Sequence, residues 1–95
     1  GMSSKERRQR SAKIREQLKP LKQKLDSCEK EIAKNESRVS VLEEKMRDPA
    51  FFKKGQETQQ AMSEYDSIKR KVDRLYEEWE ELTQELAALE EALSG

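Results

Sequence analysis

Apolar residues recur along this chain in two separate series, each stepping alternately three and four positions. The first series breaks once, at Asn35, and the second is continuous. Alternate steps of three and four average 3.5 residues, the period of a coiled-coil seam that keeps one narrow stripe against a partner helix. We therefore predict two long helices that pack on each other. The series are Ile14, Leu18, Leu21, Leu25, Cys28, Ile32, Asn35, Val39, Leu42, Met46 and then Ala61, Tyr65, Ile68, Val72, Leu75, Trp79, Leu82, Leu86, Leu89, Leu93.

The residues between the two series predict a tight turn. Asp48 can cap a helical turn that starts at Pro49, and Gly55 can end it. The expected fold is all-α, an antiparallel two-helix coiled-coil hairpin over residues 14–95. Helix one covers about 14–47, the turn 48–55 and helix two about 56–93. Residues 1–13 are expected to be a tag remnant followed by a basic linker or a frayed helix.

Pro20 lies inside the first predicted helix, on its outer face. Proline removes an amide donor, and its ring presses on the carbonyl four residues back, which here belongs to Glu16. Ile14 and Leu18 nevertheless keep the phase of the series before Pro20. We expect a kink near Pro20, or a tight turn within residues 16–20, after which the seam resumes.

Five side chains have individual predictions. Asn35 is expected to be a polar contact that fixes the register of the two helices, and Cys28 a small apolar filler. Trp79 is predicted to be the main packing anchor of helix two, so Trp79→Ala would destabilise the fold by several kcal/mol. Phe51 and Phe52 either close the end of the seam or form an exposed contact point.

Charge favours one register for the hairpin. If Leu25 faces Leu75 and Ile32 faces Ile68, every flanking pair joins opposite charges, whereas a shift of one heptad brings like charges together. Each exposed pair contributes only about 0.2–1 kcal/mol, but the agreement distinguishes registers of similar apolar burial. The predicted pairs are Lys24–Glu78, Glu31–Lys71, Arg38–Glu64, Glu36–Lys69 and Arg15–Glu90.

Composition restricts the classes of function. Of the 95 residues, 42% are charged and 33% hydrophobic, which suits a two-helix seam better than a globular core. With one cysteine, no histidine and three glycines, the chain offers neither a zinc site nor a glycine-rich phosphate loop. Its carboxylates lie on predicted solvated faces, where nothing tunes them for acid catalysis. We expect no catalytic, cofactor or metal site, no membrane span, and a cytoplasmic location.

The zero net charge conceals an uneven distribution. Residues 1–47 hold fourteen basic and eight acidic residues, a net of +6, and residues 48–95 hold six and twelve, a net of −6. The basic residues of the first arm are candidate phosphate contacts. The alternative is a solvated arm that the glutamates beside it neutralise. The candidates are Lys5, Arg7, Arg8, Arg10, Lys13, Arg15, Lys19, Lys22 and Lys24, with those in 5–13 reaching furthest from the acidic arm.

Three short motifs are less generic than the seam. They are Lys19-Pro20-Leu21-Lys22, then Asp48-Pro49-Ala50-Phe51-Phe52 at the turn, then Leu-Tyr-Glu-Glu-Trp-Glu-Glu-Leu at 75–82. In this order they resemble the C-terminal coiled-coil domain of the ABC-F ATP-binding proteins, the twin-cassette ATPases of the Uup and YheS kind. The resemblance covers roughly residues 6–90. The basic helical arm of some tRNA synthetases has the same shape, but nothing in that arm calls for the Tyr-x-x-Trp motif.

The resemblance implies a non-catalytic accessory domain whose parent hydrolyses ATP in two upstream cassettes. Such parents act in the cytoplasm on ribosomes and translation, and some are linked to DNA. By analogy, basic residues of helix one would contact DNA or ribosomal RNA. The alternative is a structural or protein-interaction hairpin, a monomer or a weak homodimer joined through Phe51, Phe52, Val41 and Met62.

Overall fold

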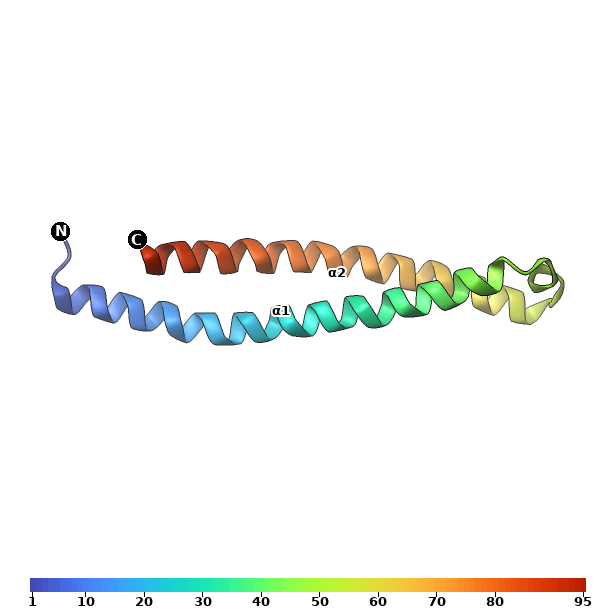
Figure 1. The fold of residues 1–95 in the computed structure, drawn as a ribbon, viewed down its shortest axis with the longest axis horizontal. Coiled ribbons are helices and arrows are strands. Elements are labelled where there is room, and N and C mark those ends of the chain that lie inside the picture. Colours follow the sequence, from blue (N-terminus) through green and yellow to red (C-terminus); the bar gives the residue numbers. More distant parts are fainter.

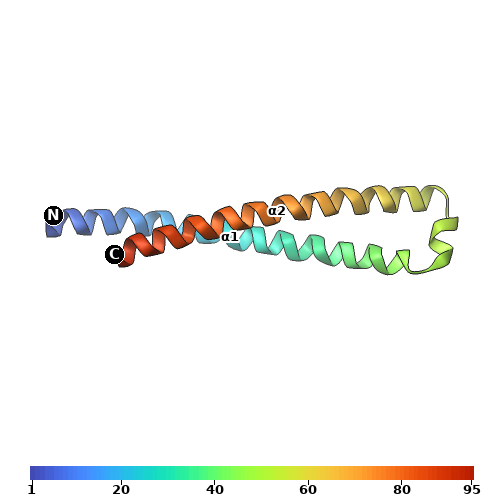
Figure 2. The same cartoon turned by 90° about the horizontal axis from the view of Figure 1, so that it is seen from above.

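The computed structural model describes residues 1–95 as a hairpin of two long helices (Figure 1). Helix α1 spans Ser4–Met46, the short 3-10 helix η1 spans Pro49–Lys53, and helix α2 spans Gln56–Ser94. The molecule is a rod with principal extents of 72 × 16 × 15 Å. Figure 2 shows α1 and α2 running in opposite directions and joined at one end by η1, which confirms the antiparallel hairpin. Neither helix is long and apolar enough to cross a membrane.

Helix α1 begins ten residues earlier than predicted. The hydroxyl of Ser3 caps it by accepting a hydrogen bond from the backbone amide of Glu6 at 3.2 Å, and Glu6 adds a negative charge to the first turn. A serine followed three residues later by glutamate is a common start of a helix, and this local pair needs no apolar seam. Residues 4–13 are therefore helical, so of the two predicted alternatives the helix fits the structure and the linker does not.

Pro20 does not interrupt α1, so the predicted alternative of a tight turn at residues 16–20 is wrong. Proline has no amide hydrogen, so the Glu16 carbonyl lacks its usual donor. Glu16 and Pro20 are both exposed, so this carbonyl lies on a face that solvent can reach. Figure 1 shows α1 as a gradual bow along its length, without a sharp break. The helix thus accommodates the proline by curvature.

The seam is buried unevenly between the two helices. On α1 the buried positions are nearly all members of the first apolar series, whereas on α2 only Leu82 is buried and most other members are half-buried. Leu21, Cys28, Ile32 and Leu82 form one cluster, with apolar neighbours from both helices packed against it. The buried residues of α1 are Ile14, Leu21, Cys28, Ile32, Asn35, Val39 and Leu42.

The register agrees with one of the five predicted charge pairs. Arg38 makes a bidentate ion pair with Glu64, in which Nε and Nη2 each lie 2.7 Å from a carboxylate oxygen. This contact lowers the pKa of Glu64, chiefly through the hydrogen bond from Arg38. Leu25 and Leu75 also pack against the same cluster, as the predicted register requires. The other four predicted pairs do not form ion pairs in this structure.

Glu36 contacts Tyr76 of α2 instead of the predicted partner Lys69. The Tyr76 hydroxyl donates a hydrogen bond to the Glu36 carboxylate, and the indole nitrogen of Trp79 donates one to Glu29 at 3.3 Å. Side chains on a helix point back toward its N-terminus, so in an antiparallel pair they tilt in opposite directions along the rod. This tilt brings together side chains whose Cα atoms lie at different positions along the rod axis. The predicted pairs assumed that interacting residues lie directly opposite each other, so the prediction did not include this offset.

Trp79 is not the main packing anchor of α2. Its side chain is 37% exposed, and Leu82 is the buried residue of this helix. An indole is too wide for a seam that is covered from one side only, and its polar edge reaches Glu29 instead. The predicted anchor role is therefore wrong.

Asn35 is buried, but its hydrogen bonds stay within α1. Its Nδ2 donates to the backbone carbonyl of Glu31 at 2.7 Å and to the Glu31 carboxylate at 3.3 Å. The amide nitrogen of Asn35 is therefore satisfied within α1, and no hydrogen bond from Asn35 to α2 fixes the register, contrary to the prediction. The Arg38–Glu64 pair makes the polar contact across the helices that Asn35 does not.

The two phenylalanines of η1 have different environments. Asp48 caps η1 by accepting a hydrogen bond from the amide of Ala50 at 3.0 Å, and Pro49 takes the first position, both as predicted. Phe51 is buried against the end of the seam, whereas Phe52 is 60% exposed. Gly55 has φ of 59°, a conformation that glycine adopts without the steric cost of a side chain, and α2 begins immediately after it.

Cys28 is buried in the cluster, and its thiol donates a hydrogen bond to the Leu75 carbonyl at 3.3 Å. Burial raises the pKa of the thiol above its ordinary value of 9.0, and the charges of Glu78 and Glu29 add to this effect. We expect iodoacetamide to alkylate the folded chain about tenfold or more slowly than the urea-unfolded chain, because both access and thiolate fraction fall.

The raised pKa of the Cys28 thiol makes the free energy of unfolding fall at alkaline pH. The folded state retains the thiol proton to higher pH than the unfolded chain, so the stabilisation is complete below the ordinary pKa and is lost as pH rises above it. Cys28→Ser is the control for this pH titration of stability.

For the alkylation experiment, equal rates in the folded and unfolded states would show that the helices do not cover Cys28.

Candidate nucleic-acid interface

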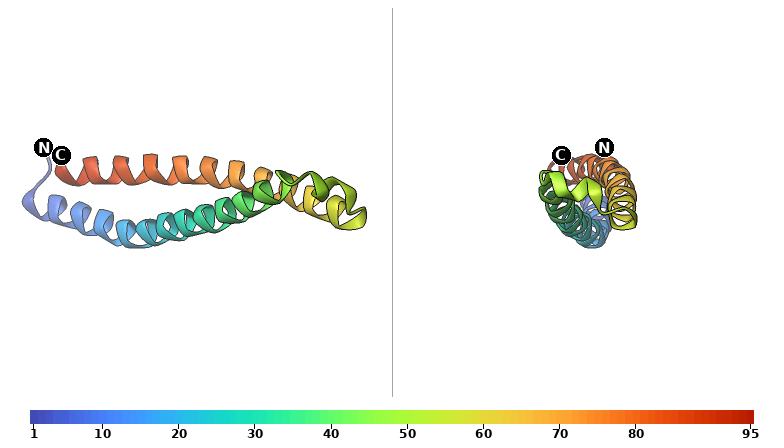
Figure 3. Two further views of the ribbon diagram at one scale, coloured as in Figure 1. Left: turned by 45° about the vertical axis from the view of Figure 1, so that its right-hand side comes forward. Right: turned by 90° about the vertical axis from the view of Figure 1, so that its right-hand side faces the viewer.

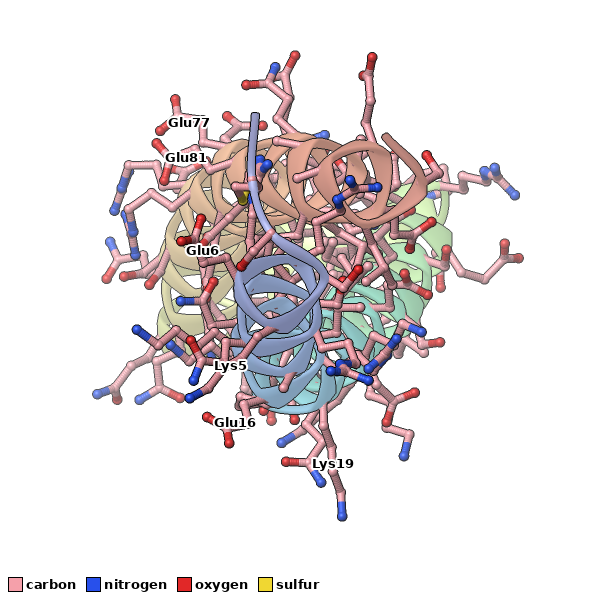
Figure 4. All side chains as sticks on the ribbon, turned by 90° about the vertical axis from the view of Figure 1, so that its left-hand side faces the viewer. Lys5, Glu6, Glu16, Lys19, Glu77 and Glu81 are labelled. Atoms are coloured by element: carbon pink, nitrogen blue, oxygen red, sulfur yellow. The ribbon has the colours of Figure 1, made fainter.

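The nine predicted basic residues lie on one end of the rod, along the first half of α1, and all are exposed. Figure 4 looks along the rod from this end: Lys19 projects from α1 away from α2, while Glu77 and Glu81 project from α2 on the other side. Lys5 also extends from α1, on the flank of the rod. The hairpin therefore separates the outer surface of the basic arm from the glutamates of α2.

None of the nine basic side chains forms an ion pair within 4.0 Å. The cation–carboxylate pairs lie further along the rod: Lys30 with Asp26 at 2.9 Å, Arg38 with Glu64, and Arg47 with Glu44 at 2.7 Å. Among the nine cations, only Arg7 makes side-chain hydrogen bonds, from its guanidinium to the Met2 carbonyl. The glutamates of α2 thus leave the basic arm without direct partners.

Three of the cations surround a single depression on α1. Arg15, Lys19 and Lys22 line it together with Leu18 and polar residues, among them Asp26. The Asp26 carboxylate already pairs with Lys30, so it competes little for these three cations. Steps of four and three residues place Arg15, Lys19 and Lys22 on one face of the helix. This group, which we call the basic triad, is the most concentrated positive feature of the arm.

The end of α2 changes the surroundings of two arginines. Arg7 and Arg10 line a depression with Ala92, Leu93, Ser94 and Gly95, so they lie beside the C-terminus of α2. A helix C-terminus carries partial negative charge, and the last turn of α2 contains no basic residue of its own. Arg7 and Arg10 therefore lie where a positive charge complements this end of the helix. The sequence signal that could have indicated this placement is the absence of basic residues after Arg74.

Two lysines of the arm also have acidic neighbours. Lys13 shares a depression with Glu6, and Lys24 shares another with Glu31 and Glu78. These carboxylates lower the positive potential around each of the two lysines. The triad lies nearer the middle of α1 than the range 5–13 favoured from sequence, whose first turns extend past the end of α2 (Figure 1).

The apolar surface proposed for dimerisation is smaller than the sequence indicated. Phe51 is buried, so it is not free to join a second copy as predicted, and Met62 is half-buried. Val41 and Phe52 remain exposed near the turn. No group of three or more metal-ligating side chains is placed to hold a metal ion.

A two-helix rod with a charged surface and a narrow seam defines the class of antiparallel helical hairpins. Residues 19–84, more than two thirds of the chain, match the family described as the ABC transporter C-terminal domain. The chain belongs to this family, which supports its interpretation as an accessory domain of an ABC protein. No curated protein and no solved structure matches the chain.

The matched range divides the basic arm. Lys19, Lys22 and Lys24 lie inside it, whereas Lys5 to Arg15 precede it. The triad therefore straddles the start of the family domain, and its two lysines flank Pro20 in the Lys-Pro-Leu-Lys motif.

Proposed function

We propose that this hairpin is a non-catalytic accessory domain of a soluble ABC-F type ATPase, and that it binds nucleic acid through the basic triad of α1. The observation that carries the proposal is the triad itself: Arg15, Lys19 and Lys22 surround one depression, and none has a carboxylate partner. Phosphate oxygens supply the negative charge that such a group lacks.

The distribution of charge favours this reading over a neutralised, solvated arm. If the glutamates of α2 neutralised the basic arm, ion pairs would join α1 and α2 at the end of the rod that carries the nine cations. None of the nine cations makes an ion pair within 4.0 Å. Arg8 and Lys5 extend the positive surface of α1 toward its N-terminus. The glutamates of α2 repel phosphates from the other side of the rod, so the potential orients the nucleic acid against α1.

The parent assignment rests on the family and on the resemblance described above. In this proposal, the ATP-binding cassettes lie in the same parent chain and perform the hydrolysis, and the hairpin holds DNA or ribosomal RNA for them in the cytoplasm. A lysine or arginine on a helix face recognises a phosphate without reading a base. The triad therefore predicts binding that depends little on sequence.

Salt titration tests the proposal. We expect a fluorescently labelled duplex to bind, with log K falling linearly against log salt at a slope of about −3 to −6, since each phosphate contact contributes about 0.9. Duplex DNA and duplex RNA of the same sequence, together with ribosomes, identify the preferred partner. A slope near zero, or no binding at low salt, would contradict the proposal. Sedimentation of the free chain over the same concentrations tests the homodimer alternative.

A further inference from the structure

Phe52 is the most exposed large apolar side chain of the molecule, at 60%. Tyr76 and Trp79 are also partly exposed, but each has a polar atom that donates a hydrogen bond to a glutamate. The Phe52 side chain has no polar atom, so no hydrogen bond within the hairpin compensates for its exposure to water. A phenyl ring held in water at the end of a rod is a candidate contact for a flat apolar partner.

The ring is held in place by the short helix that carries it. Phe52 packs edge-to-face on the buried Phe51, with ring centroids 5.1 Å apart and an interplanar angle of 88°. Pro49 and the Asp48 cap fix the first turn of η1, and Thr58 of α2 donates a hydrogen bond to the Phe51 carbonyl. Figure 3, right, looks onto this end of the rod and shows η1 crossing from α1 to α2. The ring is therefore positioned before any partner arrives, which lowers the entropy cost of binding.

Two positively charged residues follow Phe52 in the chain. Lys53 and Lys54 form no ion pair. Lys54 lines a depression with four carboxylates: Asp48 accepts a hydrogen bond from the amide of Ala50, Glu44 pairs with Arg47, Glu64 pairs with Arg38, and Glu57 forms no ion pair. An exposed phenyl ring followed in the chain by two unpaired lysines matches a nucleotide, which presents a flat base and a phosphate together.

We propose that the hairpin tip, defined as Phe52, Lys53 and Lys54, is a second nucleic-acid site that stacks an unpaired base on Phe52. This inference rests on the proposed function and adds the kind of nucleic acid that the far end of the rod accepts. About 24 residues of helix separate Lys22 from Met46, or roughly 36 Å at 1.5 Å per residue. The hairpin would thus contact a duplex at the basic triad and a single-stranded segment at the tip.

The test compares single-stranded and duplex oligonucleotides with the tip variant Phe52→Ala. We expect Phe52→Ala to weaken binding of a single-stranded oligonucleotide about 5- to 150-fold, the range of one base–aromatic stack, and to leave duplex binding unchanged. Val41→Ala is the matched control, because Val41 is also an exposed apolar residue near this end but has no ring. Circular dichroism verifies that each variant remains helical.

A second variant reports on stacking directly. Phe52→Trp in a Trp79→Phe background places a single indole at the tip, and we expect single-stranded DNA to quench its fluorescence. Unquenched fluorescence, or unchanged single-strand binding by Phe52→Ala, overturns the tip site even if duplex binding persists with its salt dependence. If Phe52→Ala abolishes self-association of the chain and leaves single-strand binding unchanged, the tip is a protein contact. Loss of duplex binding in the unmodified chain would instead refute the proposed function.

Discussion

Leu42→Ala is expected to lower the free energy of unfolding by about 2–5 kcal/mol, the cost of removing a large aliphatic side chain from a closed core. Leu42 is the one large side chain that is fully buried, at 0% exposure, and it lies close to the turn where η1 covers the end of the seam. A cavity here cannot collapse easily, because the short connection fixes the spacing of the two helices. Urea denaturation followed by circular dichroism measures the change.

Val41→Ala is the matched control for this measurement. Val41 precedes Leu42 on the same helix turn but is 46% exposed, so its truncation should change stability by no more than about 0.5 kcal/mol. Trp79→Ala should fall between the two, since its indole is only partly covered. Equal destabilisation by Leu42→Ala and Val41→Ala would mean that the helices do not pack at this end as described.

Neutralising the basic triad should have the largest effect on binding. We expect the triple variant Arg15→Gln, Lys19→Gln and Lys22→Gln to weaken duplex binding at 100 mM salt on the order of 10²- to 10³-fold. It should also reduce the magnitude of the salt slope by about 3, one unit for each lost phosphate contact. Stability should change little, because the three side chains are exposed and unpaired. Fluorescence anisotropy at several salt concentrations measures both quantities.

The matched control removes the same charge elsewhere. Lys69→Gln, Arg70→Gln and Lys71→Gln remove three exposed positive charges from α2, outside the basic arm. A non-specific effect of net charge would weaken binding equally in the two triple variants. Equal losses would therefore indicate an effect of net charge and contradict the triad as the contact, whereas a much larger loss in the triad variant would support it.

The helices and the turn were predictable because their causes are local. Steps of three and four residues require a seam, and Asp48-Pro49 starts a helical turn at the position where the structure has η1. Arg38 and Glu64 were predicted to pair, and they do. The start of α1 was missed because the Ser3–Glu6 cap is a short polar feature that the apolar series does not report.

The environments of single side chains were predicted less well. Trp79 and Phe52 looked like core residues by their position, but each belongs to a seam that is covered by one partner helix or by one short turn. Asn35 satisfies its amide within α1, an option that a pattern of positions cannot separate from a bond across the helices. The candidate site was predicted as nine cations, with those in 5–13 favoured, and in the structure the nine cations have different neighbours.

The sequence by itself determined that this protein is a hairpin of two helices with a basic arm beside an acidic one, because period, capping and charge order are properties of the chain. Only the tertiary structure decided which cations stay free, which of two adjacent phenylalanines is buried, and which ring of the seam meets water. Those outcomes depend on how far the acidic helix reaches along its partner and on how much of each side chain one neighbouring helix can cover.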